Sequence, residues 1–173
     1  MLLERAGTPS IEDLAQPKLR IAGLRINPAT SGLSRSGSVE NLKIKMTLGG
    51  EEIQVKGLPS NPKMGGFSLS RDDKFLAFTQ TEPTGISLWV VDMTSFQARP
   101  LTEIILNEIM GRSMAWTPYN KILIKAVNPT RGEIPKAPAA PAGPIIQETS
   151  GNAVPSSTYQ DLLTNSHVEV LFS

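Results

Sequence analysis

The stretch GFSLSRDDKFLAF, Gly66 to Phe78, decides the fold because the same pattern returns later in the chain. The string SMAWTPYNKILIK, Ser113 to Lys125, aligns with it at a constant offset of 47 residues and without a gap. In each copy two apolar runs flank a polar turn, Asp72-Asp73 in the first and Tyr119-Asn120 in the second. This repeat predicts two related β-hairpins.

The first copy continues into two more strand-like runs, ISLWVVDM (Ile86 to Met93) and FQARPLT (Phe96 to Thr102). A unit of about 40 to 50 residues with four short antiparallel strands is typical of a β-propeller blade. Trp89 is expected to pack inward and Asp92 to close the blade edge. With two copies only, two similar hairpins of a β-sandwich remain the alternative. We predict an all-β fold, a partial β-propeller of about two to three four-stranded antiparallel blades with a Pro-rich strap.

The residues before the repeat predict a short helix and a first strand. Ser10 is a suitable N-cap, acidic residues follow it in the first turn, and Pro17 ends the run. The alternation from Leu19 to Ile26 predicts one strand with a possible bulge at Gly23. The Ser- and Gly-rich stretch from Ala29 to Ser38 predicts an exposed loop.

A hairpin is predicted directly before the repeat. LKIKMTL alternates strictly, Gly49-Gly50 provides a turn, and EEIQV returns. One face of this hairpin should be buried, and its apolar residues are Leu42, Ile44, Met46 and Leu48.

The sequence changes character after Val127. Asn128 to Pro155 contains six prolines, and four of them recur every third residue, at 135, 138, 141 and 144. That spacing is the polyproline II period, which suits a strap or stiff connector, or alternatively a ligand for an aromatic-lined groove. Thr158 to Leu163 predicts a short helix. The predicted organisation is residues 1–38 for the N-terminal helix, strand and loop, 39–127 for the blades, 128–156 for the strap, and 157–173 for a short helix and the start of a next blade.

The composition of the chain argues against several classes of function. Seventeen basic and sixteen acidic residues give a net charge of +1 without a basic stripe, which argues against binding driven by nucleic-acid phosphates. The absence of cysteine removes disulfides, thiolate nucleophiles and thiolate metal sites. No apolar run approaches the roughly 18 residues of a membrane span, and the first ten residues do not resemble a signal peptide. The chain is therefore expected to be soluble.

Catalytic motifs are not evident in the sequence. The string from Gly32 to Gly37, with Ser34 inside it, has one residue too many for the G-x-S-x-G elbow of an α/β-hydrolase. The one histidine, His167, is expected to be a solvated surface residue. Adjacent carboxylates would point to opposite faces of a strand or lie solvated in turns, and these are Glu12/Asp13, Glu51/Glu52 and Asp72/Asp73. We predict no catalytic residue, no cofactor and no metal site.

Several strings resemble the N-terminal propeller of glutamyl endopeptidase-type members of the prolyl oligopeptidase family. They are SIEDLAQPKLRIAGLRINPAT, KGLPSNP, FSLSRDDKFLAFT, LWVVDM, RPLT, ILNEIMG, RGEIPKAPAAPAGPIIQE and TYQDLL. The third string is similar to the family's F-S-W-S-P-D-G-K pattern, with Leu69, Arg71 and Asp73 in place of the Trp, Pro and Gly. An aspartate accepts a positive φ at this turn less readily than glycine, and the turn is expected to be kept.

The resemblance implies a function for a longer protein. In such peptidases a propeller covers an α/β-hydrolase domain that carries a Ser, Asp and His triad, and no position of this chain matches those motifs. The expectation is a non-catalytic propeller fragment whose full-length parent gates and positions peptide substrates. The alternative is a stand-alone β-rich module that self-associates through open blade edges or binds another partner, with neither nucleic acid nor membrane involved. By resemblance alone, the parent would be periplasmic, secreted or plastid.

Overall fold

The computed structural model describes residues 1–21, 23–34, 37–46, 49–103 and 105–130, together with positions 132, 136 and 151. These residues form a nearly all-β chain. Its elements are β1 (Leu2–Arg5), α1 (Ile11–Ala15), β2 (Leu19–Ile21), β3 (Leu24–Asn27), β4 (Gly32–Leu33), β5 (Val39–Ile44), β6 (Ile53–Gln54), β7 (Met64–Leu69), β8 (Phe75–Glu82), β9 (Gly85–Asp92), β10 (Gln97–Pro100), β11 (Met114–Trp116) and β12 (Ile122–Ile124).

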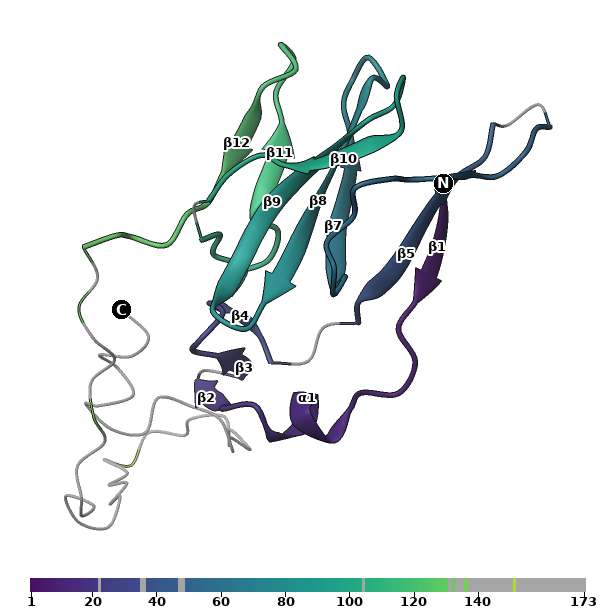
Figure 1. Cartoon of the computed structure of the whole chain (residues 1–173). Helices are drawn as coiled ribbons and strands as arrows, with labels where there is room; N and C mark the ends of the chain where they lie inside the picture. The colour runs from purple at the N-terminus through teal and green to yellow at the C-terminus, as the bar shows by residue number, and fades with distance from the viewer. Residues whose placement is uncertain are drawn as a thin grey trace.

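The main sheet has seven strands in the order β1-β5-β7-β8-β9-β10, and β6 pairs with β5. It curls strongly (Figure 1), because the chain that leaves β6 crosses to the outer edge of β10. There Lys56 donates its backbone N–H to Phe96 O at 2.9 Å, and Ala98 donates to Lys56 O at 2.8 Å. The edge of β10 is thereby partly covered, which limits its exposure as a template for another strand.

Two apolar cores lie on opposite faces of β8 and β9, because side chains alternate between the faces of a strand. The first core fills the curl of the main sheet and includes Phe78 and Leu42, both fully buried. The second core lies between β8-β9 and the β11-β12 hairpin, where Leu106 is fully buried. A central hairpin with both faces covered explains why LAFTQ in β8 is buried without a break.

The 47-residue repeat is visible in the backbone. Asp73 and Asn120, which align at that offset, both adopt the left-handed region, with φ of 58° and 54°. Asp73 donates its N–H to Ser70 O at 3.1 Å, and Asn120 donates to Thr117 O at 3.2 Å. The predicted turn is therefore kept in both copies, even though neither has glycine at this position.

Replacing Asp73 by glycine is expected to stabilise the chain by about 0.5 to 1 kcal/mol. Left-handed backbone costs an ordinary residue about 1 to 2 kcal/mol, and glycine's extra entropy in the unfolded state offsets only part of that gain. Asn120→Gly is the matched control and should be close to neutral, because asparagine accepts this conformation more easily. Urea unfolding followed by circular dichroism measures both, and a loss of stability in Asp73→Gly would contradict the strain argument.

The two repeats pack side by side through their first strands. Trp116 of β11 donates its indole N–H to the Ser68 carbonyl of β7 at 3.0 Å. Four antiparallel strands, β7 to β10, make the first unit, and the β11-β12 hairpin begins the second. The curled antiparallel sheet is compatible with a partial β-propeller, as the repeat predicted.

The structure confirms some local predictions and corrects others. Helix α1 starts at the predicted cap, Ser10. The run from Leu19 to Ile26 is not one bulged strand: Gly23, with φ of 81°, turns the chain so that β2 pairs with β3. The alternation from Leu42 placed Met46 on the buried face of its strand, and this prediction is wrong, because Met46 is 61% exposed.

The predicted loop from Ala29 to Ser38 is only partly a loop. β4 lies within it, and Ser31 is 1% exposed. Asn27 bends the chain here, because its carbonyl accepts the N–H of Ser31 and its side chain accepts the N–H of Ala29. Polar composition suggested exposure, but these local hydrogen bonds allow the segment to pack against Ile86 of β9 and against Glu108, which precedes the second repeat.

Four further predictions lie outside the described residues or across their limits. The structure does not describe most of the Pro-rich strap or the predicted helix at Thr158 to Leu163. It also does not describe His167 or Leu48. The boundaries 1–38, 39–127, 128–156 and 157–173 therefore stay predictions.

Candidate functional site

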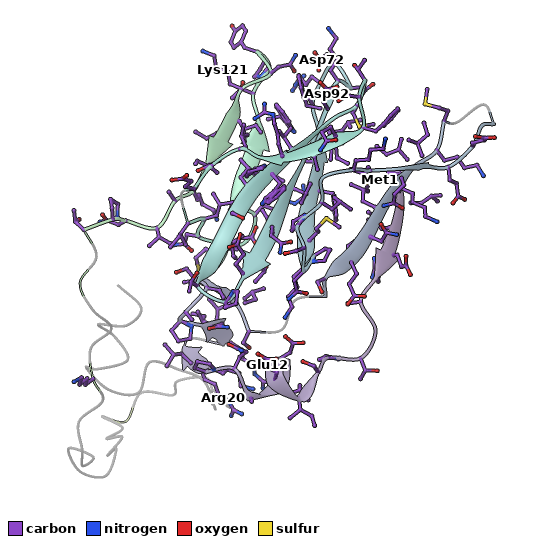
Figure 2. The ribbon with its side chains drawn as sticks, in the orientation of Figure 1. Met1, Glu12, Arg20, Asp72, Asp92 and Lys121 are labelled. Atoms are coloured by element: carbon purple, nitrogen blue, oxygen red, sulfur yellow. The ribbon has the colours of Figure 1, made fainter. Side chains whose placement is uncertain are left out.

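The adjacent carboxylates take part in local structure. Asp72 accepts the Ser70 hydroxyl at 2.7 Å within the first repeat's turn, and Asp92 accepts the Thr94 N–H at 2.7 Å in the turn after β9. Glu52 pairs with Lys43 at 3.4 Å on the exposed face of the hairpin. Among the described residues, no three acidic or histidine side chains gather as a metal site would require. Figure 2 shows Asp72 and Asp92 at the same end of the main sheet.

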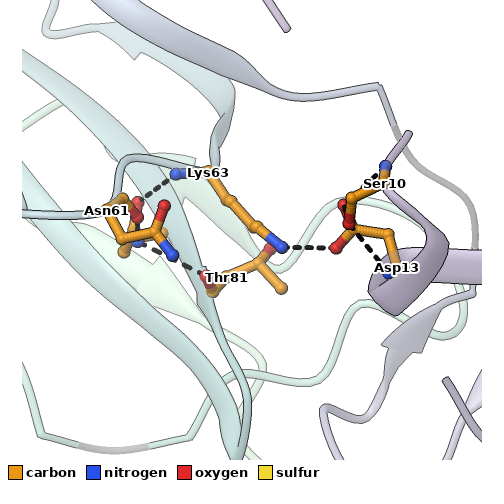
Figure 3. Close-up of polar contacts among 6 residues, drawn as sticks. Ser10, Asp13, Asn61, Lys63 and Thr81 are labelled. Atoms are coloured by element: carbon orange, nitrogen blue, oxygen red, sulfur yellow. Dashed lines mark hydrogen bonds and ion pairs between the residues drawn. The ribbon is translucent and has the colours of Figure 1, made fainter. Parts of the chain in front are cut away.

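Asp13 joins the helix to the sheet. Its carboxylate accepts the backbone N–H of Ser10 at 3.3 Å in a capping box, and it forms an ion pair with Lys63 at 2.5 Å (Figure 3). The Lys63 ammonium, followed by the Ser10 hydroxyl, lowers the pKa of Asp13 below its ordinary value. The contact is largely solvent-exposed, so we assign it a positioning role and little net stability.

A buried amide holds the loop before β7 in place. Gln80, 3% exposed, donates to Asn61 O at 2.9 Å and accepts the Lys63 N–H at 2.9 Å. This side chain also donates to Thr81 O at 3.3 Å, so both of its N–H donors and its carbonyl oxygen are used. Gln80 thus ties the Asn61–Lys63 loop to β8, and the loop in turn holds Asp13 and α1.

The stability of the chain in acid should depend on the ionised carboxylates of Asp72 and Asp92, which lie in turns. The backbone N–H groups of Thr94 and then Ser95 lower the pKa of Asp92, and the Ser70 hydroxyl first lowers that of Asp72, each from an ordinary 3.8. Because the unfolded state binds these protons more tightly, the stabilisation is fully present above about pH 5 and is lost as the pH falls below 3.8 through the lowered folded values. We expect the urea midpoint to fall over that range.

The control for this pH dependence is Asp92→Asn, which retains an oxygen acceptor for the turn and removes the titrating group. Its urea midpoint should fall less steeply between pH 5 and 3 than that of the unchanged chain. Equal slopes would show that Asp92 does not contribute to acid sensitivity.

The serine considered as a nucleophile does not lie in an elbow. Ser34 follows β4, and its backbone N–H donates to Arg25 O at 2.8 Å in the small β2-β3-β4 sheet. Its hydroxyl is shielded from solvent and has no hydrogen-bond partner among the described residues. A hydrolase nucleophile needs an adjacent base, and the one histidine of the chain, His167, lies outside the described part.

An apolar hollow of about 270 Å³ opens where the first core reaches the surface. Strand β5 pairs with β7 only at Val39 and Met64, so the hollow lies between other parts of these strands. Its lining contains one charged residue, Lys45, and the others are Met1, Ile44, Met46, Phe67, Ser68, Leu69, Leu76 and Met93. Methionine side chains adapt easily to an apolar partner, so this hollow is suited to receive an apolar side chain.

No sequence pattern indicated the hollow or the hydrogen bonds by which Gln80 holds the loop before β7. Each depends on segments that are distant in sequence, such as residues 44–46 and 67–69 for the hollow. The sequence also did not indicate which strands lie at the edges of the sheets.

In the described part of the chain, no helix is long and apolar enough to cross a membrane.

The described residues thus define a class of molecule, a nearly all-β scaffold compatible with a partial β-propeller. In sequence, the chain is similar to a protein named probable glutamyl endopeptidase, chloroplastic, from Oryza sativa subsp. japonica, with 34% identity over 188 residues. The protein of the same name from Arabidopsis thaliana is 32% identical over 185 residues.

These similarities cover 99% of this chain but 20% and 19% of the two relatives. The chain therefore spans about a fifth of the length of the curated relatives it matches. No family model matches the chain, and no solved structure matches it.

Proposed function

We propose that this chain is the non-catalytic propeller portion of a serine peptidase of the prolyl oligopeptidase family, similar to glutamyl endopeptidases. The observation that carries the proposal is similarity along 99% of this chain to about a fifth of each named endopeptidase. The curled antiparallel sheet and the repeated hairpin support it, because both suit a scaffold built from blades.

In this proposal the chain acts through shape, and another part of a longer protein supplies the reacting groups. The β7-β10 unit and the β11-β12 hairpin form part of a wall that admits and positions peptide substrates. The carboxylates Asp13, Asp72 and Asp92 hold the helix and the turns of this wall. Cleavage beside glutamate would then depend on a Ser-Asp-His domain outside this chain.

A chimera tests the architectural role. Residues of the rice relative that match this chain are replaced by the chain itself, and cleavage of a glutamate-containing peptide is measured beside labelling by a fluorophosphonate serine probe. We expect the chimera to cleave and be labelled, the purified chain to do neither, and a deletion of the matched segment to lose cleavage. Cleavage by the purified chain that disappears in Ser34→Ala or His167→Ala would overturn the proposal.

A second candidate is a stand-alone β-rich binding module. It is favoured by the edges of β1 and β12, which have no second partner strand in the described part of the chain, and by the apolar hollow of about 270 Å³. Light scattering with electron microscopy on the purified chain separates the two candidates: a regular ring or filament supports the module, and amorphous aggregate supports a fragment of a longer peptidase.

A further inference from the structure

β1 and β12 are two of the sheet edges that have a paired strand on one side only among the described residues. β1 ends the seven-stranded sheet and pairs with β5 on one side only. β12 belongs to a two-stranded sheet and pairs with β11 on one side only. The bridge between Leu106 and Ala126 does not fill that edge, because Asn107 and Ser113 bond the same residue, Lys125, on the β11 side. A two-stranded hairpin is marginal, so a third strand would stabilise it.

The side chains of β1 and β12 alternate in the same way between a face directed at a core and an exposed face. On β1, Leu3 packs against the first core, which leaves Leu2, 41% exposed, and Glu4 on the opposite face. On β12, Ile122 packs against the second core, and Leu123, 69% exposed, lies on the opposite face. On each edge, an inward apolar residue therefore stands next to an outward leucine.

The charges are complementary. Glu4 accepts a hydrogen bond from the Asn41 amide at 3.3 Å, and neither it nor Lys121 forms an ion pair among the described residues. Lys121 directly precedes β12 and shares the outward face with Leu123, two positions along the chain. An antiparallel partner strand with an acidic residue two positions after a leucine would satisfy both.

We propose that the β1 edge of a second copy of this chain adds to the β12 edge as an antiparallel strand. One register aligns every feature: Leu2 lies opposite Leu123, Leu3 opposite Ile122, and Glu4 opposite Lys121. The second copy then continues the β11-β12 hairpin with its own β1 and β5. A shift by one residue in either direction would bring Leu3, which faces the core, opposite an outward residue, Leu123 or Lys121, so the faces fix the register.

The contact joins different copies. Met1 and Lys121 lie at opposite sides of the molecule in Figure 2, and so do β1 and β12 in Figure 1. Each copy therefore offers both edges, and the contact is head to tail. Head-to-tail contacts produce rings where the rotation closes and filaments where it does not.

This inference rests on the second candidate function, and it is independent of the peptidase proposal. A chain that stays monomeric overturns the edge contact and leaves the chimera experiment unaffected. Failure of the chimera likewise leaves the edge contact standing.

Cysteine pairing tests the register directly, because the chain contains no cysteine of its own. Equal amounts of Leu2→Cys and Leu123→Cys chains, with tags of different mass at the C-terminus, are mixed under mild oxidation. Residues directly opposite each other in a sheet have Cβ atoms about 4.5 to 5.5 Å apart, close to disulfide range. We expect the mixed disulfide to form at least tenfold faster than with the control Ala115→Cys, which lies on β11 across from Leu123.

Charge exchange gives a second readout by sedimentation velocity over a range of concentrations. Lys121→Glu should weaken assembly about tenfold, because like charges then face each other. Mixing Lys121→Glu chains with Glu4→Lys chains should restore it. A monomer at all concentrations, equal cross-linking of the Ala115→Cys control, or no restoration by the exchanged pair would each overturn the proposal.

Discussion

Replacing Phe78 by alanine is expected to lower the free energy of unfolding by about 3 to 5 kcal/mol. Phe78 is fully buried in the first core. Its ring stacks with Trp89 at a centroid distance of 6.1 Å and lies 5.7 Å from the ring of Phe67. The substitution removes these contacts and leaves a cavity that the surrounding strands can close only in part.

Urea unfolding followed by tryptophan fluorescence measures this loss, since Trp89 reports on the same core. Leu123→Ala is the control: its side chain is 69% exposed, so its effect in dilute monomer should stay within about 0.5 kcal/mol. If Phe78→Ala does not fold, Phe78→Leu provides a smaller, measurable loss. A Phe78→Ala chain as stable as the Leu123→Ala control would show that the first core does not form as described.

Gly57→Ala is expected to cost about 3 kcal/mol, through two effects at one position. Gly57 has φ of 71°, where side chains with a Cβ are strained. An added Cβ would also lie 2.7 Å from Ala98 O and would overlap the Gln97 side chain. The carbonyl belongs to the backbone of β10, so the strand itself would have to move. The backbone hydrogen bonds of Lys56 with Phe96 and Ala98 should weaken.

Gly111→Ala separates the two effects. Gly111 has φ of 84°, but an added Cβ there meets nothing within 4 Å. It should cost only the backbone strain, about 1 to 2 kcal/mol. Equal losses for the two variants, measured by the same urea titration, would show that the close approach to β10 contributes nothing. Hydrogen exchange at the Ala98 amide, which bonds Lys56 O, should accelerate in Gly57→Ala only.

Several elements could be read from local sequence because local physics forms them. Ser10 caps α1 through contacts within three residues. Asp73 and Asn120 turn the chain through bonds within their own turns. The alternation in β5 and the continuous apolar run in β8 correctly indicated strands.

Other features depended on contacts that the sequence does not display. Ser31 looked like part of an exposed loop and is buried, because the segment before the second repeat reaches it: Glu108 donates its N–H to Ser31 O at 2.9 Å. Gly23 looked like a bulge and is a turn, because β3 pairs back on β2. Met46 continues an inward alternation and is exposed, because it lies beyond the last residue of β5.

The sequence by itself determined the strands of the hairpin that includes β5 and of the two repeats, the polar turns and the 47-residue repeat, and these were sufficient for the all-β fold class. Only the tertiary structure decided that the chain after β6 covers the edge of β10 and that β5 and β7 separate around a hollow. It also decided that, among the described residues, β1 and β12 have a paired strand on one side only. The physical reason is range: periodicity and turn chemistry act between residues a few positions apart, whereas edges and hollows arise from pairings between segments far apart in the chain.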